Sequence, residues 1–98
     1  MKYSVYILYS QSADMYYIGH TEDVFRRFEE HNNPVRFSKF TAKATPWTIA
    51  AFFPLFATRS EAMAAEKFIK KQKSRRFTEE LINQKADLSV IKSLLKLE

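Results

Sequence analysis

The stretch YYIGHTEDVFRRFEEH, residues 16–31, decides the fold because it joins a strand-like segment to a helix-like one. It holds Gly19, the only glycine of the chain, between a tyrosine pair and a run with two arginines and a histidine. Glycine is favoured where a backbone needs a positive φ or a close approach to another group. The stretch alone therefore predicts a strand-to-helix turn. A catalytic interpretation requires that its polar residues converge with others on one place.

Two strand-like segments lead up to this glycine. Residues 2–10 (KYSVYILYS) and 15–19 (MYYIG) are rich in β-branched and aromatic residues, and a polar connection separates them, so a β-hairpin is expected. A turn centred between residues 11 and 12 places Tyr6 opposite Tyr17. Residues directly opposite each other project from one face, with Cβ atoms about 5 Å apart. The two phenols should therefore lie side by side.

A helix is expected after Gly19. Thr21 is a good N-cap, and the carboxylates that follow it complement the helix dipole. The helix should run to about His31, with Val24 and Phe28 as its apolar stripe, because two asparagines and a proline come next.

A helical-wheel projection of this helix places its two adjacent arginines on different sides. At 100° per residue, Arg27 and His31 fall at one edge of the apolar stripe. Arg26 points further toward solvent. We therefore group Arg27 with His31, and count Arg26 among the residues available to a partner.

A third strand and a long helix are expected in the second half. Residues 47–56 (WTIAAFFPLF) form the strand candidate, and its proline indicates an edge or a bulge. Thr58 and Glu61 have the spacing of a capping box for a helix from about residue 59 to 73. Glu66 lies at the border of the apolar face of that helix.

The whole chain, residues 1–98, is expected to form a single domain, since 98 residues are enough for one core and too few for two. Two short helices are predicted near its end, in FTEELINQ (77–84) and LSVIKSLLKL (88–97). We place the core at about residues 2–82 and the C-terminal helix at about residues 87–97.

Charge favours a polyanionic partner such as nucleic acid. Sixteen lysines and arginines against eleven acids give a net charge of +5 and a pI near 9.6. Basic residues gather in VRFSKFTAKAT (35–45) and KFIKKQKSRRF (67–77), although a solvated helix end would explain the second run equally well. The candidate nucleic-acid contacts are Arg26, Arg36, Lys39, Lys43, Lys67, Lys70, Lys71, Lys73, Arg75 and Arg76.

Composition also excludes several classes of protein. Without cysteine, the chain has no disulfide and no thiol chemistry, and two histidines are too few to support a zinc site. The first residues lack the features of a signal peptide, and no apolar run approaches the roughly 18 residues of a membrane span. We therefore expect a cytoplasmic protein without a membrane partner.

The singled-out side chains suit phosphodiester hydrolysis. That reaction needs an activated water, positive charge beside the phosphate and help for the leaving oxygen. The residues that provide these groups are Tyr6, Tyr17, Arg27, His31 and Glu66. Mg²⁺ suits one carboxylate, because water and phosphate oxygens complete its coordination.

Each of these residues also has an ordinary structural explanation. The tyrosines are typical strand aromatics. Arg27 can bridge to Asp23 and Glu66 to Lys70, each four residues away, and such exposed pairs contribute roughly 0.3 to 0.5 kcal/mol. His31 suits the negative end of a helix dipole. The combination, rather than any member, carries the functional interpretation.

That combination resembles the GIY-YIG nuclease superfamily. Its parts are SVY at residues 4–6, YIG at 17–19, Arg27 eight residues after the glycine, His31 four further on, and Glu66 in a later helix. The chain is most similar to the small single-domain branch related to the N-terminal nuclease domain of excinuclease C. A serine stands where the first motif usually begins with glycine.

The resemblance covers about residues 2–82 and implies an α+β fold, a three-stranded antiparallel sheet flanked by helices. It implies a site with one Mg²⁺ or Mn²⁺ ion, for which Glu66 is the sole protein ligand. It assigns the remaining roles as follows: one of Tyr6 and Tyr17 helps to activate water, Arg27 stabilises the phosphate, His31 assists proton transfer, and Gly19 lets the tyrosine strand turn directly into the arginine helix. Asn83 is an additional candidate.

The function expected from the resemblance is a divalent-metal-dependent endonuclease that hydrolyses DNA phosphodiester bonds in repair or processing. Two alternatives stay open. One is a nucleic-acid-binding module with little or no turnover on the same scaffold, and the other is an interaction domain whose motif residues are vestigial.

Overall fold

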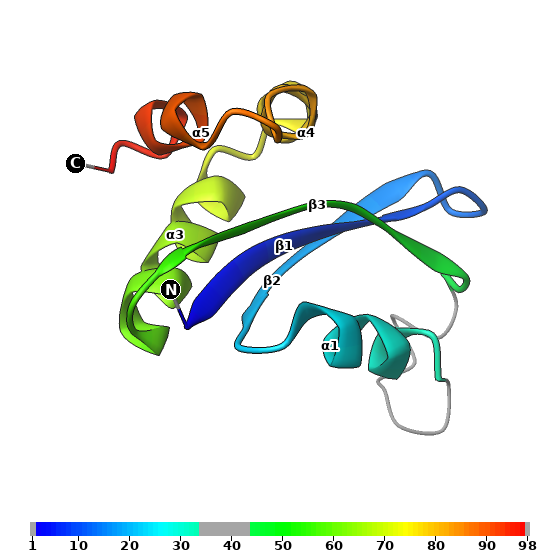
Figure 1. Ribbon diagram of the computed structural model, residues 1–98. Helices are drawn as coiled ribbons and strands as arrows, with labels where there is room; N and C mark the ends of the chain where they lie inside the picture. Colours follow the sequence, from blue (N-terminus) through cyan, green and yellow to red (C-terminus); the bar gives the residue numbers. More distant parts are fainter. Residues whose placement is uncertain (1, 34–43, 98) are drawn as a thin grey trace.

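A three-stranded antiparallel sheet forms the centre of the molecule, described here from a computed structural model at residues 2–33 and 44–97 (Figure 1). The strand order is β2-β1-β3, so β1 pairs with both neighbours. In chain order the elements are β1 (Tyr3–Ser10), β2 (Met15–Thr21), α1 (Val24–His31), β3 (Trp47–Phe56), α3 (Arg59–Lys71), α4 (Arg75–Asn83) and α5 (Leu88–Leu94). The predicted α+β class, with helices flanking this sheet, is confirmed.

The helices cover both faces of the sheet, with α1 on one face and α3, α4 and α5 on the other (Figure 1). Successive strand side chains point to opposite faces. In β1, Val5 and Ile7 therefore pack toward α3, whereas Tyr6 and Leu8 pack toward α1 and Trp47. All four β1 residues are at most 1% exposed, which fits a central strand buried on both faces.

The register of the β1–β2 hairpin differs from the prediction by two residues. Tyr6 pairs with Gly19, and Tyr17 pairs with Leu8. The predicted position of the turn was wrong because β1 extends to Ser10, so the connection occupies residues 11–14. A shift of two residues keeps every side chain on its face. The two tyrosines therefore still share a face, as diagonal rather than direct neighbours.

The connection from β2 to α1 also differs from the prediction. Gly19 lies inside β2, without a positive φ, and the strand continues to Thr21. Asp23, not Thr21, is the N-cap, because its carboxylate accepts a hydrogen bond from the Arg26 amide at 3.1 Å. Thr21 instead accepts from the Asp23 amide and shapes the turn. The helix ends at His31 as predicted.

The capping box predicted for α3 is present and fixes its start. The Thr58 hydroxyl accepts from the Glu61 amide at 3.2 Å, and the Glu61 carboxylate accepts from the Thr58 amide at 3.1 Å. The buried residues of α3 are Ala62, Ala65 and Ile69. Small residues at two of these positions allow the helix to pack close to β1 and β2.

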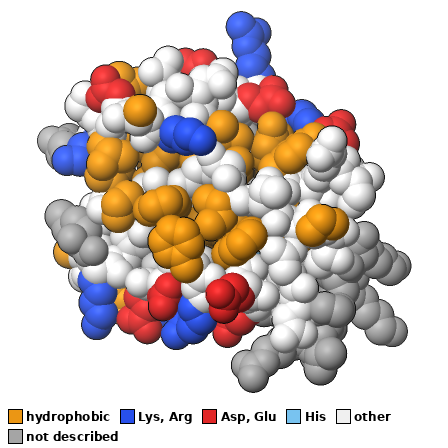
Figure 2. Space-filling view, turned by 45° about the vertical axis from the view of Figure 1, so that its right-hand side comes forward, with side chains coloured by type: hydrophobic (Ala, Val, Ile, Leu, Met, Phe, Trp, Pro, Cys, Tyr) orange, Lys and Arg blue, Asp and Glu red, His pale blue; other side chains and the backbone are white. Residues whose placement is uncertain are grey.

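Some hydrophobic side chains stay at the surface. Figure 2 shows them gathered in a band across one face, with charged side chains above and below. Phe25 of α1 and Phe52 of β3 are both exposed, and their rings meet edge to face at 5.9 Å. No helix in the described ranges has the length and apolarity that crossing a membrane would require.

Candidate active site

Four of the five predicted site residues lie together on the α1 side of the sheet. The Tyr6 hydroxyl is 2.9 Å from His31 Nε2. The Tyr17 ring lies 4.4 Å from the His31 ring and 6.3 Å from the Tyr6 ring, centre to centre. The Arg27 guanidinium lies beside the Tyr6 phenol, where it lowers the pKa of that phenol. Two strands and one helix therefore bring these groups into a single cluster.

Burial keeps the central pair of this cluster uncharged. Tyr6 is 1% exposed and His31 is fully buried. Burial raises the pKa of Tyr6 to about 12, although the Arg27 guanidinium opposes this rise. Burial, assisted by the positive charge of Arg27, lowers the pKa of His31 to about 4. Near neutral pH the pair is therefore a phenol beside a neutral imidazole.

Gly19 contributes space to this cluster. A Cβ at this position would stand 2.5 Å from the Tyr6 hydroxyl oxygen and 2.6 Å from Cζ. The Tyr6 ring thus lies directly against the β2 backbone. The predicted role of Gly19, a turn from strand into helix, was wrong because the glycine is paired within the strand.

Arg27 lies at the edge of the cluster, as the helical wheel predicted. Its side chain is partly exposed, and Nη1 donates to Glu30 Oε1 at 3.3 Å. The alternative bridge to Asp23 is not formed, because Asp23 caps the helix. Arg27 thus combines contact with the buried phenol and access to solvent, and Arg26 is fully on the exposed side.

Glu66 approaches from the other side of β2. Its Oε1 accepts a hydrogen bond from His20 Nδ1 at 2.7 Å, and its Oε2 accepts one from Lys70 Nζ at 2.6 Å. His20 follows Gly19 and points to the opposite face of the sheet. The carboxylate makes no direct bond to the tyrosines, but its charge raises the pKa of Tyr6. Glu66 is therefore beside the cluster rather than inside it.

The chemistry of Glu66 fits a divalent cation held by one protein ligand. Within the described ranges, no three His, Cys, Asp or Glu side chains gather as a metal cage. A lone carboxylate with 16% exposure suits Mg²⁺ or Mn²⁺, which keep water and phosphate oxygens as their other ligands. The Lys70 ammonium now lies 2.6 Å from Oε2, and its side chain is 53% exposed to solvent. The donor set therefore fits, with Lys70 as a competitor.

Asn83 is not brought to the cluster. It lies at the end of α4, exposed, beside a hollow that Tyr16, Glu79 and Ile82 also line. Tyr16 and Tyr17 are neighbours in β2 and point to opposite faces. The position of Asn83 thus gives it no contact with Tyr6 or His31.

The predicted basic contacts fall into three groups. Arg36, Lys39 and Lys43 lie outside the described residues. Lys70 and Arg75 are engaged, Lys70 by Glu66 and Arg75 by Asp14 at 2.6 Å and Glu79 at 3.3 Å. The remaining side chains are exposed and form no ion pair within the described ranges; they are Arg26, Lys67, Lys71, Lys73 and Arg76.

Sequence reasoning missed two side chains that organise the site. His20 fixes Glu66, and its only signal was a histidine directly after the glycine. Asn32 was expected merely to stop α1, but its side chain accepts from the Trp47 amide at 2.6 Å and donates to the Trp47 carbonyl at 3.1 Å. Asn32 thereby joins the end of α1, beside His31, to the start of β3.

Comparison with known proteins identifies relatives of this chain. A family model described as the GIY-YIG catalytic domain matches residues 2–80. A UPF0213 protein of Listeria monocytogenes is 45% identical over 60 residues, which cover 61% of this chain and 65% of that protein. No solved structure matches significantly.

Two fungal relatives are named as structure-specific endonuclease subunits. SLX1 of Meyerozyma guilliermondii is 35% identical over 78 residues, 76% of this chain and 26% of that protein. Slx1 of Schizosaccharomyces japonicus is 35% identical over 69 residues, 67% of this chain and 25% of that protein. The chain thus spans about a quarter of these two proteins.

Proposed function

The chain belongs to the GIY-YIG family of nuclease catalytic domains, and from that premise we propose that it is a divalent-metal-dependent endonuclease that hydrolyses DNA phosphodiester bonds. The observation that supports this most is the cluster of Tyr6, Tyr17, Arg27 and His31, with the Glu66 carboxylate within electrostatic range. Each member has a chemical role in hydrolysis that its surroundings suit.

Of the two tyrosines, we assign to Tyr17 the role of helping to activate the attacking water. It is partly exposed, whereas Tyr6 is almost fully buried. The Tyr6 hydroxyl and His31 Nε2 share one hydrogen bond, and the Arg27 guanidinium beside the phenol lowers its pKa. The Tyr6–His31 pair holds Arg27 and the Tyr17 ring in place. The proton of its hydrogen bond is the one that His31 would pass on during the reaction.

Arg27 supplies the fixed positive charge. Its guanidinium stays charged at any working pH and its fork suits two phosphate oxygens. Partial exposure lets it meet a phosphate from solvent, while the contact with Tyr6 limits its freedom. Preorganised charge beside the reacting phosphate is usually a large part of catalysis.

Glu66 would hold the divalent cation, with His20 orienting its other oxygen. When bound, the ion polarises a phosphate oxygen and offsets the charge that develops during attack. The exposed basic residues Lys67, Lys71, Lys73 and Arg76 lie on or after α3, the helix that carries Glu66. They would bind neighbouring phosphates of the same nucleic acid.

The fungal relatives are named structure-specific endonuclease subunits, which favours a substrate that is recognised by its structure. We propose DNA as that substrate, with a role in repair or processing. Their designation as subunits favours a partner protein for this chain as well. A cytoplasmic location remains a prediction from the sequence.

A nucleic-acid-binding module without turnover is the second candidate. Burial of Tyr6 and His31, and occupation of both Glu66 oxygens by His20 and Lys70, favour it. Such a module would keep the salt-dependent affinity for DNA and lack cleavage.

Cleavage of defined DNA substrates tests the proposal. Purified chain with Mn²⁺ or Mg²⁺ is offered duplex, flap, fork and four-way junction DNA, with a single-stranded RNA as a further arm. Glu66→Gln, Arg27→Ala and Tyr17→Phe should each abolish cleavage, whereas Glu80→Gln, an exposed acid on α4, should not. Melting curves confirm folding of each variant.

The outcomes separate the candidates. Cleavage that survives all three substitutions places the chemistry elsewhere or in a contaminant. Binding without cleavage by the unaltered chain, across every substrate and both metals, favours the binding module.

A further inference from the structure

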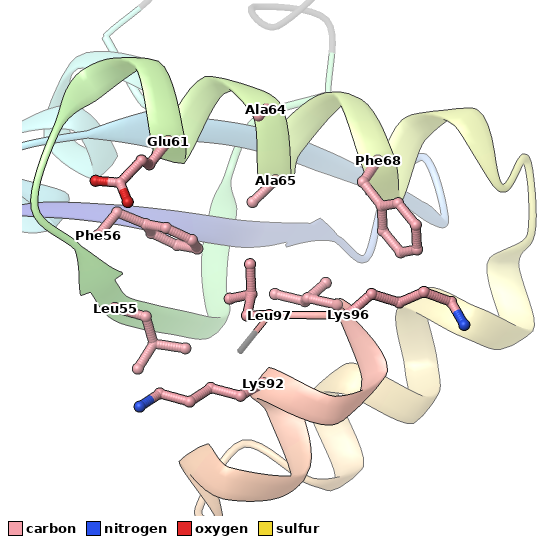
Figure 3. A pocket seen from close by; sticks show the side chains of 10 residues that line it. Leu55, Phe56, Glu61, Ala64, Ala65, Phe68, Lys92, Lys96 and Leu97 are labelled. Atoms are coloured by element: carbon pink, nitrogen blue, oxygen red, sulfur yellow. The ribbon is translucent and has the colours of Figure 1, made fainter.

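An apolar groove of about 640 Å³ lies on the sheet face opposite Tyr6 and His31. It runs between α3, the end of β3 and the segment after α5 (Figure 3). Its apolar lining includes Leu55, Phe56, Ala64, Phe68, Leu95 and Leu97. The described cluster of tyrosines, arginine and histidine contributes nothing to it, so catalysis does not explain the groove.

Two lysines stand at the rim of this groove. Figure 3 shows the Lys92 side chain directed toward Leu55 and the Lys96 side chain directed toward the other end, near Phe68. Neither lysine has a salt bridge or side-chain hydrogen bond among the described residues. Glu61, the acid at the groove, is already engaged in the α3 cap, where it accepts from Thr58 at 3.1 Å. Those neutral donors leave the carboxylate charged, so two lysines and one glutamate surround the apolar floor, and the lysines stand at its opposite ends.

Lys96 occupies a backbone position that favours glycine. Its φ is 60°, and it follows the end of α5, where Leu97 N donates to Lys92 O at 2.8 Å and Lys96 N donates to Ser93 O at 3.1 Å. This is a Schellman motif, which usually places glycine at the left-handed residue. Lysine there works against local stability and directs an ammonium to the rim. The groove rim thus holds a cation at a position where lysine has a local backbone cost.

We propose that the groove docks an acidic amphipathic segment of a partner protein, with apolar side chains on the floor and carboxylates on Lys92 and Lys96. Charge complementarity identifies this occupant, because cations at opposite ends suit a segment lying along the groove. A single anionic head on an apolar tail would meet only one of the lysines. A nucleic acid would leave the apolar floor uncovered.

Peptide selection against the full chain tests this docking. A displayed library of random peptides about 16 residues long, enough for four helical turns, is selected on the unaltered chain and depleted on K92E/K96E. Apolar residues flanked by Asp and Glu should be enriched. The affinity of the best peptide is then measured by fluorescence anisotropy, and its site by amide chemical shifts.

Two lysine variants and one control variant make the test specific. Lys92→Ala and Lys96→Gly should each weaken the selected peptide about tenfold, which corresponds to roughly one full charge-assisted contact. Arg26→Ala removes the same charge from α1 on the other face and should leave affinity unchanged. Lys96→Gly should also raise the melting temperature by a few degrees, because glycine fits the left-handed backbone conformation. For a chain of this size, that is roughly the shift expected when the backbone strain of one residue is removed.

Several results would overturn the proposal. The selection would contradict it if no peptides were enriched, or if the enriched peptides lacked acidic residues. The binding measurements would contradict it if the lysine variants left the affinity unchanged, or if the amide chemical-shift changes mapped away from the groove. It would also be overturned if dodecanoate displaced the peptide at a concentration below that of the peptide. The last would identify a small anionic amphiphile as the occupant. The test is independent of DNA cleavage, so it stands if the nuclease proposal fails.

Discussion

The Tyr6 phenol lies where a side chain at Gly19 would have to be, with its oxygen 2.5 Å and its Cζ 2.6 Å from an added Cβ. Of the two reasons for glycine, a positive φ and a close approach, only the second applies, because Gly19 has no positive φ. The glycine lets a cross-strand ring lie against the backbone. The Tyr6 hydroxyl thereby reaches His31.

Gly19→Ala is expected to displace the Tyr6 ring. Overpacking of this kind typically costs about 1–3 kcal/mol of unfolding free energy. Urea unfolding measures the loss, and a Tyr6→Ala background should remove most of the added cost, because the clashing ring is gone. An equal cost in both backgrounds would show that the glycine serves something other than the ring.

Strand and helix identity followed from the sequence because side-chain patterns are local. The β-branched and aromatic residues of β1, the spacing of Val24 and Phe28 and the Thr58–Glu61 capping box each report on a few neighbouring residues. The hairpin register did not follow, because it depends on turn length. The predicted direct pairing of the tyrosines was wrong, but an error of two residues kept both on one face, so their rings still lie near each other.

The partners of Glu66 illustrate what sequence could not supply. The bond to Lys70 spans four residues of one helix and was foreseen as an alternative to metal binding. The bond to His20 spans 46 residues and depends on how α3 crosses β2. Such a contact is set by packing, and a single sequence has no local signal for it.

The buried His31 should make the fold less stable in mild acid. Its pKa is lowered to about 4, against about 6.5 for an unfolded chain, so the unfolded chain binds a proton that the folded chain does not. Stability should therefore fall as pH drops from 6.5 toward 4, by up to about 3 kcal/mol. Urea unfolding at half-unit steps measures this slope.

A His31→Gln variant supplies the comparison. It should lose most of the slope between pH 6.5 and 4.5, above the range in which Asp14 and Asp87, whose pKa values are lowered, take up protons. Circular dichroism at pH 7 checks that the variant is folded. An unchanged slope would place the responsible proton on another residue.

Lys70 should compete with a divalent cation for Glu66. Its ammonium lies 2.6 Å from Oε2, so Lys70→Met, which keeps most of the apolar stem, should raise the affinity for Mn²⁺ about two- to fivefold. Glu66→Gln should abolish binding. Electron paramagnetic resonance of free Mn²⁺ measures both without any cleavage assay.

Lys71→Met is the matched control, since it removes the same charge from the next residue of α3, which is exposed and has no ion pair among the described residues. Equal gains from Lys70→Met and Lys71→Met would mean a general charge effect rather than local competition. Binding that persists in Glu66→Gln would remove the carboxylate as the ligand.

The basic residues should divide into those that bind DNA and one that supports the fold. Arg75 Nη2 donates to Asp14 at 2.6 Å, its Nη1 donates to the Asp14 carbonyl at 2.8 Å, and its guanidinium lies over the Tyr16 ring. It therefore joins α4 to the hairpin. Lys67, Lys71 and Arg76 are exposed and free of such contacts within the described ranges.

We expect Lys67→Ala, Lys71→Ala and Arg76→Ala each to reduce the salt dependence of DNA binding. The slope of log K against log salt should decrease in magnitude by about one for each phosphate-binding cation that is removed. Arg75→Ala should leave that slope nearly unchanged and lower the melting temperature instead, because its charge is committed to Asp14 and Glu79. Anisotropy titrations between low and moderate salt measure the slopes. A slope that falls for Arg75→Ala as much as for the other three would mean that Arg75 leaves its carboxylate partners for phosphate, and that its link to the hairpin turn breaks when DNA binds.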